Sequence, residues 1–145
     1  MHSKVLFVCH GNICRSVMAE YMMKKYIKDL GISEMECFSR AVSYEEQGND
    51  IYPAAKACLR KHGIPFERHH AARIDQQDYD NSDVIFIMDA SNQYYIRRIV
   101  ADTEGKIRML LDRDVADPWY TNDFEKTYAD LKEGIENYLR EKGYL

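Results

Sequence analysis

The residues best suited to chemistry are Cys9 and Arg15, which frame the segment Cys9-His-Gly-Asn-Ile-Cys-Arg-Ser16. Four apolar residues, Val5 to Val8, precede the segment, as is typical of a buried strand, and a helix pattern begins at Arg15. A strand that passes through a tight turn into a helix aims several backbone N–H groups at one point, where the helix dipole adds partial positive charge. The spacing therefore predicts an anion-binding turn with a thiol at its start.

The side chains of this turn suit nucleophilic attack on a bound anion. A thiol attacks only as the thiolate, which the loop amides, the helix N-terminus and the Arg15 guanidinium would stabilise. Arg15 also offers a planar fork that matches two oxygens of a phosphate. Gly11 lets the backbone turn and approach a ligand, Asn12 tolerates a left-handed conformation, and Ser16 can donate a hydrogen bond to the thiolate. The predicted phosphate-binding loop comprises His10, Gly11, Asn12, Ile13, Cys14, Arg15 and Ser16.

A second interpretation of these residues stays open at this point. Cys9 would be a small buried hydrophobe and Arg15 a solvated helix residue, since the same spacing also arises by chance. The glycine and asparagine between them, the strand pattern before them and the helix pattern after them favour the reactive site.

The segment Val8-Cys-His-Gly-Asn-Ile-Cys-Arg-Ser16 resembles the signature of the low-molecular-weight protein tyrosine phosphatases, and the resemblance extends along nearly the whole chain. Its further matches are Ser39 to Ser43, Cys58 to Ile64, Met88 to Asn92 and Asp117 to Tyr120. The resemblance implies hydrolysis of phosphotyrosine and small aryl phosphates through a phosphocysteine, without metal or cofactor. The substrate would be a phosphotyrosine-containing protein, with a tyrosine kinase among the candidate partners.

A second candidate catalytic group lies in an Asp-Pro-Trp-Tyr segment that begins at Asp117. A thiolate that cleaves a phosphate ester needs a proton for the leaving oxygen, and the phosphocysteine then needs a base to activate water; one carboxyl group can serve both steps. Asp-Pro is by itself a common turn signal. The resemblance makes Asp117 the acid and base, and makes Trp119 and Tyr120 walls that stack on a phosphotyrosine ring. It also implies a supporting hydrogen bond between Ser43 and Asn12.

Length and composition are those of one ordinary globular domain, predicted to span residues 1–145. The net charge is −4 and the sequence pI is about 5.7, so no nucleic-acid or anionic-membrane partner is expected. No stretch has the length of a signal peptide core or a membrane span. A cytoplasmic location is therefore predicted.

The four cysteines, at positions 9, 14, 37 and 58, fit neither a zinc pattern nor a disulfide framework. No metal site is predicted from their spacing. Cys37 and Cys58 are interpreted as buried small hydrophobes. Cys14 shares a turn with Cys9, so two hypotheses stand side by side: a reversible Cys9–Cys14 bridge that protects the nucleophile from over-oxidation, or simple packing of Cys14 under the loop.

Strand and helix patterns alternate, which predicts parallel strands joined by right-handed crossovers. The expected fold is a three-layer α/β domain with a twisted four-stranded parallel sheet and helices on both faces. Because ligands of such sheets bind beyond the carboxyl ends of the strands, Cys9, Ser43, Asp89 and Asp117 should gather at one edge. Strands are predicted at 4–8, 35–40, 84–88 and 106–111, and helices at 16–30, 53–62, 90–100 and 122–142.

Some residues depart from the pattern of the family that the chain resembles. His10 stands where leucine is common, so it either makes the pocket wall beside the loop more polar and titratable or, as we expect, faces solvent. An acidic Tyr-Glu-Glu run begins at Tyr44. It either forms a solvated face of the loop or gives the site a preference for substrate peptides with basic flanking residues. The resemblance favours a structural role for His70, through a hydrogen bond to a carboxylate. Asp89 is expected to be a structural carboxylate or to brace Arg15.

Two other functions compete with the phosphatase. An arsenate reductase shares the cysteine-arginine loop but needs further cysteines after the third strand, where this chain has Met88 and Asp89. A silent phosphotyrosine-binding module would be expected to lack Cys9, Arg15 or Asp117, and all three are present.

Overall fold

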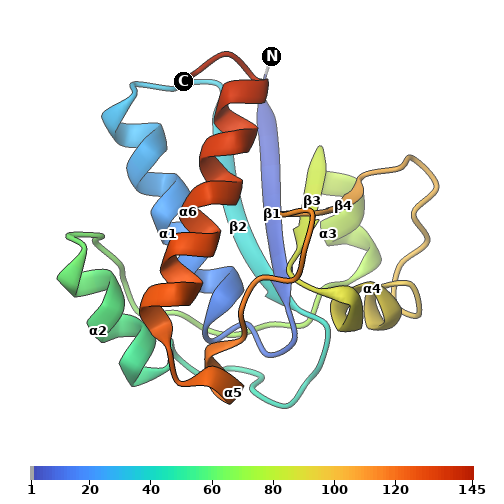
Figure 1. Cartoon of the computed structure of the whole chain (residues 1–145). Coiled ribbons are helices and arrows are strands. Elements are labelled where there is room, and N and C mark those ends of the chain that lie inside the picture. Colours follow the sequence, from blue (N-terminus) through green and yellow to red (C-terminus); the bar gives the residue numbers. More distant parts are fainter. Residues whose placement is uncertain (1) are drawn as a thin grey trace.

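A computed structural model describes residues 2–145, in which four parallel strands form one sheet (Figure 1). β1 pairs with β2 along one edge, where Cys9 lies opposite Ala41, and with β3 along the other. Two neighbours on opposite sides of β1 create the switch in strand order where open parallel sheets leave a crevice for ligands. The strands are β1 (Ser3–Cys9), β2 (Met35–Ala41), β3 (Val84–Ile87) and β4 (Ile107–Met109), in the order β2-β1-β3-β4.

Helices cover both faces of the sheet, so the predicted three-layer α/β fold is confirmed (Figure 1). One layer contains α1, α2 and α6, and the opposite layer contains α3 and α4. The helices are α1 (Arg15–Asp29), α2 (Pro53–Lys61), α3 (Gln76–Asn81), α4 (Ala90–Ile96), α5 (Pro118–Thr121) and α6 (Phe124–Glu141). No helix within residues 2–145 has the length and apolar character that crossing a membrane requires.

The central strand β1 is apolar on both sides because it is covered on both sides. Val5 and Phe7 pack into the core beneath α1 and α6, whereas Leu6 and Val8 pack into the core beneath α3 and α4. All four side chains are fully buried. This double burial holds β1 rigidly in the sheet and so fixes the position of Cys9 at its end.

Two predicted elements are shorter in the structure. The helix predicted at 90–100 ends at Ile96, and the chain continues in tight turns in which the Ile99 amide donates to the Ile96 carbonyl at 3.0 Å. Val100 still packs in the same core cluster as Ile96, so its apolar character reflects burial rather than helix. The strand predicted at 106–111 is reduced to β4, because the chain turns at Leu110 to pass beneath α6.

Two short helices were not predicted. α3 begins at a capping box in which the Asp75 carboxylate accepts from the Asp78 amide at 2.8 Å. α5 begins at Pro118, directly after the N-cap residue Asp117, where a loop was expected. Asn122 then adopts a left-handed conformation, with φ of 56°, so the final helix begins at Phe124 instead of residue 122.

Candidate active site

A pocket of about 450 Å³ opens where the strands end, and it brings together segments that lie far apart in the sequence. The loop after β1 supplies Cys9 and Arg15, the end of β3 leads to Asp89, and the segment after β4 supplies Asp117. All four line the same pocket, so the convergence predicted for Cys9, Asp89 and Asp117 is correct. Ser43, which was predicted to join them, does not line the pocket and instead contacts the loop from outside it.

The Cys9 sulfur is surrounded by hydrogen-bond donors. It accepts from the backbone amides of Asn12 and Ser16, each at 3.4 Å, and lies 3.0 Å from the Ser16 hydroxyl oxygen. The Asn12 side-chain amide donates to that oxygen at 2.7 Å, which leaves the Ser16 proton free to point at the sulfur. Three donors around a sulfur that is only 3% exposed suit a thiolate.

Backbone amides at the mouth of the loop are available to an anion. Within residues 2–145, the amides of Gly11, Ile13, Cys14 and Arg15 donate to no protein acceptor, although all four residues line the pocket. Arg15 is the first residue of α1, so the positive end of that helix dipole faces the same space. The arrangement can bind a dianion such as a phosphate monoester.

Arg15 is buried and held by two carboxylates. Its guanidinium donates to Asp89 at 2.8 Å, to the Val115 carbonyl at 3.2 Å and to Asp117 at 3.3 Å. Burial alone would lower the pKa of Arg15, but the charges of Cys9, Asp117 and Asp89 outweigh it and raise that pKa above its ordinary value. Asp89 also accepts from the Asn92 amide as the N-cap of α4, so it both braces Arg15 and has a structural role.

Asn12 holds the loop in shape through its backbone and its side chain. Its φ is 64°, the left-handed conformation that its residue type predicts. Its side-chain amide donates to Ser39 at 3.0 Å, and its side-chain oxygen accepts from the Ala72 amide at 3.2 Å. The His69 ring donates to the Asn12 carbonyl at 2.8 Å. Burial lowers the pKa of His69, and the hydrogen bond to Asn12 opposes that effect only in part.

Two predicted contacts of the loop are different in the structure. Ser43 does not bond to Asn12; its hydroxyl donates to the His10 carbonyl at 3.0 Å, while Ser39, within β2, takes the predicted role. The predicted structural histidine is His69 rather than His70, because residue 69 faces inward and residue 70 is exposed. The His69 backbone amide, not its ring, donates to the carboxylate of Asp50 at 2.9 Å.

The support extends beyond the loop into a buried polar chain that sequence reasoning missed. The Ser39 hydroxyl donates to Glu20 at 2.6 Å, and Glu20 pairs with Lys24 one turn further along α1. Glu20 is buried on the otherwise apolar inner side of α1, and Ser39 is buried within β2. A carboxylate among apolar helix positions is the signal that could have identified this chain.

Aromatic side chains form the rim of the pocket. Trp119 and Tyr120 both line it, as predicted, and are 61% and 84% exposed. Asp117 holds this segment, since its carboxylate accepts from the Trp119 amide at 3.0 Å. Behind the rim, Tyr52 contacts Trp119 edge-on and stacks on Phe124, with ring centroids 5.6 Å and 6.1 Å apart.

Two of the departures from the family pattern, His10 and the acidic run after Tyr44, meet at the pocket. His10 does not simply face solvent, because its ring lies 3.1 Å from the Glu45 carboxylate and edge-on against Tyr95. Glu45 and Glu46 line the pocket, and the Glu46 side chain lies 3.3 Å from the position that a Cβ atom of Gly11 would take. A side chain at position 11 would therefore press on Glu46, whereas the left-handed residue of the loop is Asn12.

Cys14 differs from Cys9 in its surroundings. Burial, reinforced by the negative charges of Cys9 and Asp117, raises the pKa of the Cys14 thiol to about 12. At neutral pH Cys14 therefore stays protonated, and Cys9 is the thiol with the donors that an anion needs. The fold and this set of side chains define the class of protein: an α/β protein with a cysteine, an arginine and an aspartate around a phosphate-sized pocket.

Comparison with known proteins identifies the family. The model of the low molecular weight phosphotyrosine protein phosphatases matches residues 4–142. The protein-tyrosine-phosphatase PtpA of Staphylococcus aureus strain MRSA252 is 35% identical over 141 residues, which cover 93% of this chain and 90% of PtpA. This chain therefore belongs to the low-molecular-weight protein tyrosine phosphatase family, and it is a hydrolase that acts on phosphotyrosine in proteins.

Solved structures agree with this identification. The crystal structure of YfkJ from Bacillus subtilis superposes with a TM-score of 0.92 at 34% identity, covering 97% of this chain and 94% of YfkJ. A Drosophila arginine phosphatase superposes with a TM-score of 0.87 at 27% identity, covering 96% and 97% of the two chains. The arsenate reductase alternative finds no support, because Asp89 at the end of β3 binds Arg15 where that reaction would need a cysteine.

Proposed function

We propose that Cys9 is the nucleophile of this phosphatase and that Asp117 transfers the protons. The Cys9 thiolate attacks the phosphorus of phosphotyrosine, the bond from phosphorus to the phenolic oxygen breaks, and the Asp117 carboxylic acid gives its proton to that oxygen. In the second step the Asp117 carboxylate takes a proton from water, which attacks the phosphocysteine. Inorganic phosphate leaves, and the thiolate is restored.

The loop and Arg15 stabilise the charge that develops during both steps. The transferring phosphoryl group carries its charge on three equatorial oxygens, which the free loop amides and the Arg15 fork can contact together. Arg15 donates to Asp117 before substrate arrives, so it also holds the acid near the reacting group. The proposed phosphate-binding loop is the segment from His10 to Ser16, with Ser43 supporting it through the His10 carbonyl.

The observation that carries this proposal is the placement of one buried sulfur among three donors, in the same pocket as the Arg15–Asp117 pair. Cys9→Ser should abolish hydrolysis of para-nitrophenyl phosphate while phosphate still binds, as measured by calorimetry. Cys37→Ser, at a buried cysteine outside the pocket, serves as the control and should remain active. Residual turnover by Cys9→Ser close to that of the control would reject Cys9 as nucleophile.

The aromatic rim favours phosphotyrosine over phosphoarginine, the substrate that the name of the Drosophila neighbour indicates. Trp119 and Tyr120 present exposed ring faces on which a flat phenyl group can stack. Peptides that carry one or the other phosphorylated residue in the same sequence would distinguish the two. Faster hydrolysis of the phosphoarginine peptide would contradict the assignment.

Proposals on partner and setting follow from the same site. A protein phosphorylated on tyrosine, with a tyrosine kinase among the candidates, is the expected partner, and capture by Cys9→Ser would identify it.

We propose that residues 1–145 act as one domain and that this domain operates in the cytoplasm, because the reaction needs Cys9 in its reduced form and the four cysteines are free. The reversible Cys9–Cys14 bridge remains a prediction. After treatment with peroxide and then reductant, Cys14→Ser should regain less phosphatase activity than the wild type, and equal recovery would reject the bridge.

A further inference from the structure

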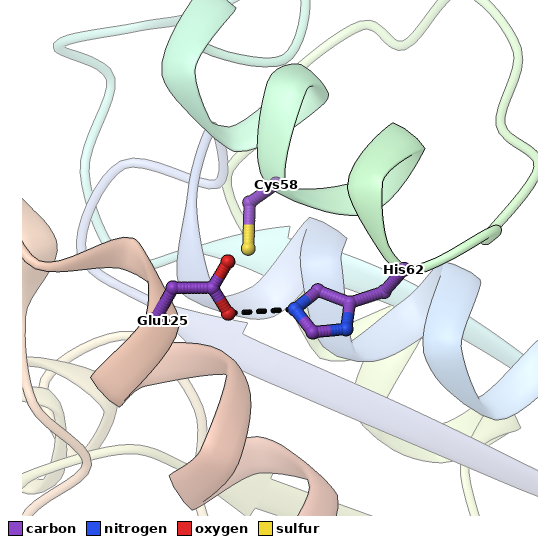
Figure 2. Close-up of side chains that lie close together, drawn as sticks. All are labelled: Cys58, His62 and Glu125. Carbon is purple, nitrogen blue, oxygen red and sulfur yellow. Dashed lines mark hydrogen bonds and ion pairs between the residues drawn. The ribbon is translucent and has the colours of Figure 1, made fainter.

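Three side chains with metal-ligand chemistry converge between the end of α2 and the start of α6 (Figure 2). They are Cys58, His62 and Glu125, and their ligand atoms all lie within 4.8 Å of one another. None of the three lines the active-site pocket. Figure 2 shows the Cys58 sulfur and the His62 ring directed toward the same Glu125 carboxylate.

The backbone explains why these groups meet. Cys58 and His62 are four residues apart at the end of α2, so their side chains lie on the same side of the helix. Glu125 is in the first turn of α6, and its carboxylate lies 2.6 Å from the His62 ring nitrogen Nε2. The His62 ring stacks on Tyr128 with centroids 3.7 Å apart, which fixes the direction of that nitrogen.

The surroundings combine an enclosed thiol with an open entrance. Cys58 is 5% exposed, whereas the side chains of His62 and Glu125 are 28% and 47% exposed, so an ion can enter from their side. The end of α2 also places the negative end of its helix dipole at the cluster, which favours a cation. One group opposes a cation there: the Lys61 ammonium pairs with Glu125 at 3.0 Å.

We propose that Cys58, His62 and Glu125 bind a divalent metal ion of the zinc class. Sulfur, imidazole nitrogen and carboxylate oxygen are the ligands that zinc prefers, and three protein ligands leave a fourth tetrahedral position for water. Zinc–ligand bonds of about 2.0 to 2.3 Å bring tetrahedral ligand atoms to about 3 to 4 Å from one another. The ion therefore draws the sulfur inward and opens the His62–Glu125 hydrogen bond.

Binding requires the Cys58 thiol to lose its proton to solvent as the metal–sulfur bond forms. Burial and the nearby Glu125 raise the pKa of that thiol to about 11, against the opposing charge of Lys61. Lys61, which pairs with Glu125, and Tyr128, which stacks on the His62 ring, are further titratable side chains beside the cluster.

An ion here would tie α2 to α6 next to the active-site rim. Without it, the Cys58 thiol donates to the carbonyl of Phe124 at 3.6 Å, and the Phe124 ring stacks on Tyr52 behind Trp119. A ligand that binds only the folded chain raises its apparent stability, so metal should increase the melting temperature.

Cobalt(II) titration of the intact chain tests the site, because a cobalt–thiolate bond absorbs in the near ultraviolet whereas zinc is silent. We expect this band in the wild type and in Cys9→Ser, which removes the catalytic thiol. Cys58→Ser should lose it, and Cys37→Ser, the matched buried thiol, should keep it. A band that survives Cys58→Ser, disappears in Cys9→Ser or never forms would overturn the proposal.

Lys61→Ala provides a test that leaves the buried core unchanged. Removing the ammonium frees the Glu125 carboxylate, so cobalt and zinc should bind severalfold more tightly, whereas Glu125→Gln should weaken them by tenfold or more. A role for these residues in helix packing alone predicts no gain in metal affinity. Unchanged or weaker binding by Lys61→Ala would therefore count against the site.

Discussion

At the scale of single residues, the chemistry of Cys9 depends on Ser16, and the orientation of Ser16 depends on Asn12. The Asn12 side-chain amide donates to the Ser16 oxygen, which leaves the hydroxyl proton free to point at a Cys9 thiolate 3.0 Å away. Asn12 is in turn fixed by Ser39 and His69. The surroundings of the proposed nucleophile are thus set by the side chains packed behind it, Ser39 and His69 among them.

Arg15→Lys should lower kcat/KM for para-nitrophenyl phosphate by about 10²- to 10³-fold, because a lysine cannot contact two phosphate oxygens with a planar fork. It also cannot hold Asp89 and Asp117 at the same time in the present geometry. Steady-state kinetics at matched pH would measure the loss. The control is Arg113→Lys, which changes an exposed arginine paired with Glu133 and should leave activity unchanged.

Asp117→Asn should keep phosphate affinity but reduce turnover by about 10²- to 10⁴-fold, the usual contribution of general acid and base catalysis. The loss should grow as the leaving group becomes more basic, so an alkyl phosphate suffers more than para-nitrophenyl phosphate. Asp112→Asn, at an exposed carboxylate in the same segment, is the matched control. Equal turnover of an alkyl phosphate by the mutant and the wild type would reject the role of Asp117.

At the scale of elements, α6 can lie close to the sheet only because it contains a glycine. A Cβ atom on Gly134 would come within 2.4 Å of Leu110 Cγ and within 2.9 Å of both its methyl groups. Leu110 follows β4 and is buried beneath α6. The chain between Leu110 and α6 carries Asp117, so this packing positions the acid as well as the helix.

Gly134→Ala should destabilise the fold by about 1–3 kcal/mol, because the whole Leu110 side chain must move rather than its tip alone. Urea denaturation would measure the change in the free energy of unfolding. The double variant Gly134→Ala with Leu110→Ala should cost less than the sum of the two single changes, since the small side chain relieves the clash. Additive losses would show that the two residues do not press on each other.

At the scale of the whole molecule, the net charge is −4, so the proposed binding of a phosphate dianion depends on local positive charge and hydrogen-bond donors. The loop amides, the dipole of α1 and Arg15 act over a few ångströms, while Glu45 and Glu46 make the pocket entrance acidic. We expect this entrance to favour phosphopeptides with basic flanks. The buried imidazole of His69, which supports the loop, should also make the stability of the fold depend on pH.

His69 should make the protein less stable as the pH falls below about 6.5, the ordinary pKa of histidine. Burial holds its folded-state pKa below the unfolded value, so between the two values the unfolded chain binds more protons and unfolding is favoured. One such proton contributes at most about 1.4 kcal/mol per pH unit. Urea denaturation at pH 7.5 and 5.5 should show a smaller drop for His69→Gln than for wild type.

The exposed neighbour His70 supplies the control for this measurement. His70→Gln should retain the pH dependence of the wild type. If His69→Gln and His70→Gln lost stability equally on acidification, the buried imidazole would not be the cause.

The sequence alone determined the turn between β1 and α1 that is proposed to bind phosphate, because residues 5–16 form the strand, turn and helix start locally, and each residue type matches its position. It also determined the order of strands and helices, since burial on two faces leaves long apolar runs such as β1. It did not predict α3 and α5, each of which depends on its cap rather than on apolar periodicity.

Only the tertiary structure decided which polar side chains support the site. Ser39 rather than Ser43 reaches Asn12, and His69 rather than His70 faces the loop, because the register of β2 against β1 and the path of the 69–72 segment select them. His62 meets Glu125 across 63 residues of sequence, and Cys58 joins them, only because α2 packs against α6. Local spacing determines local geometry, whereas contacts between distant segments depend on how the helices and strands pack.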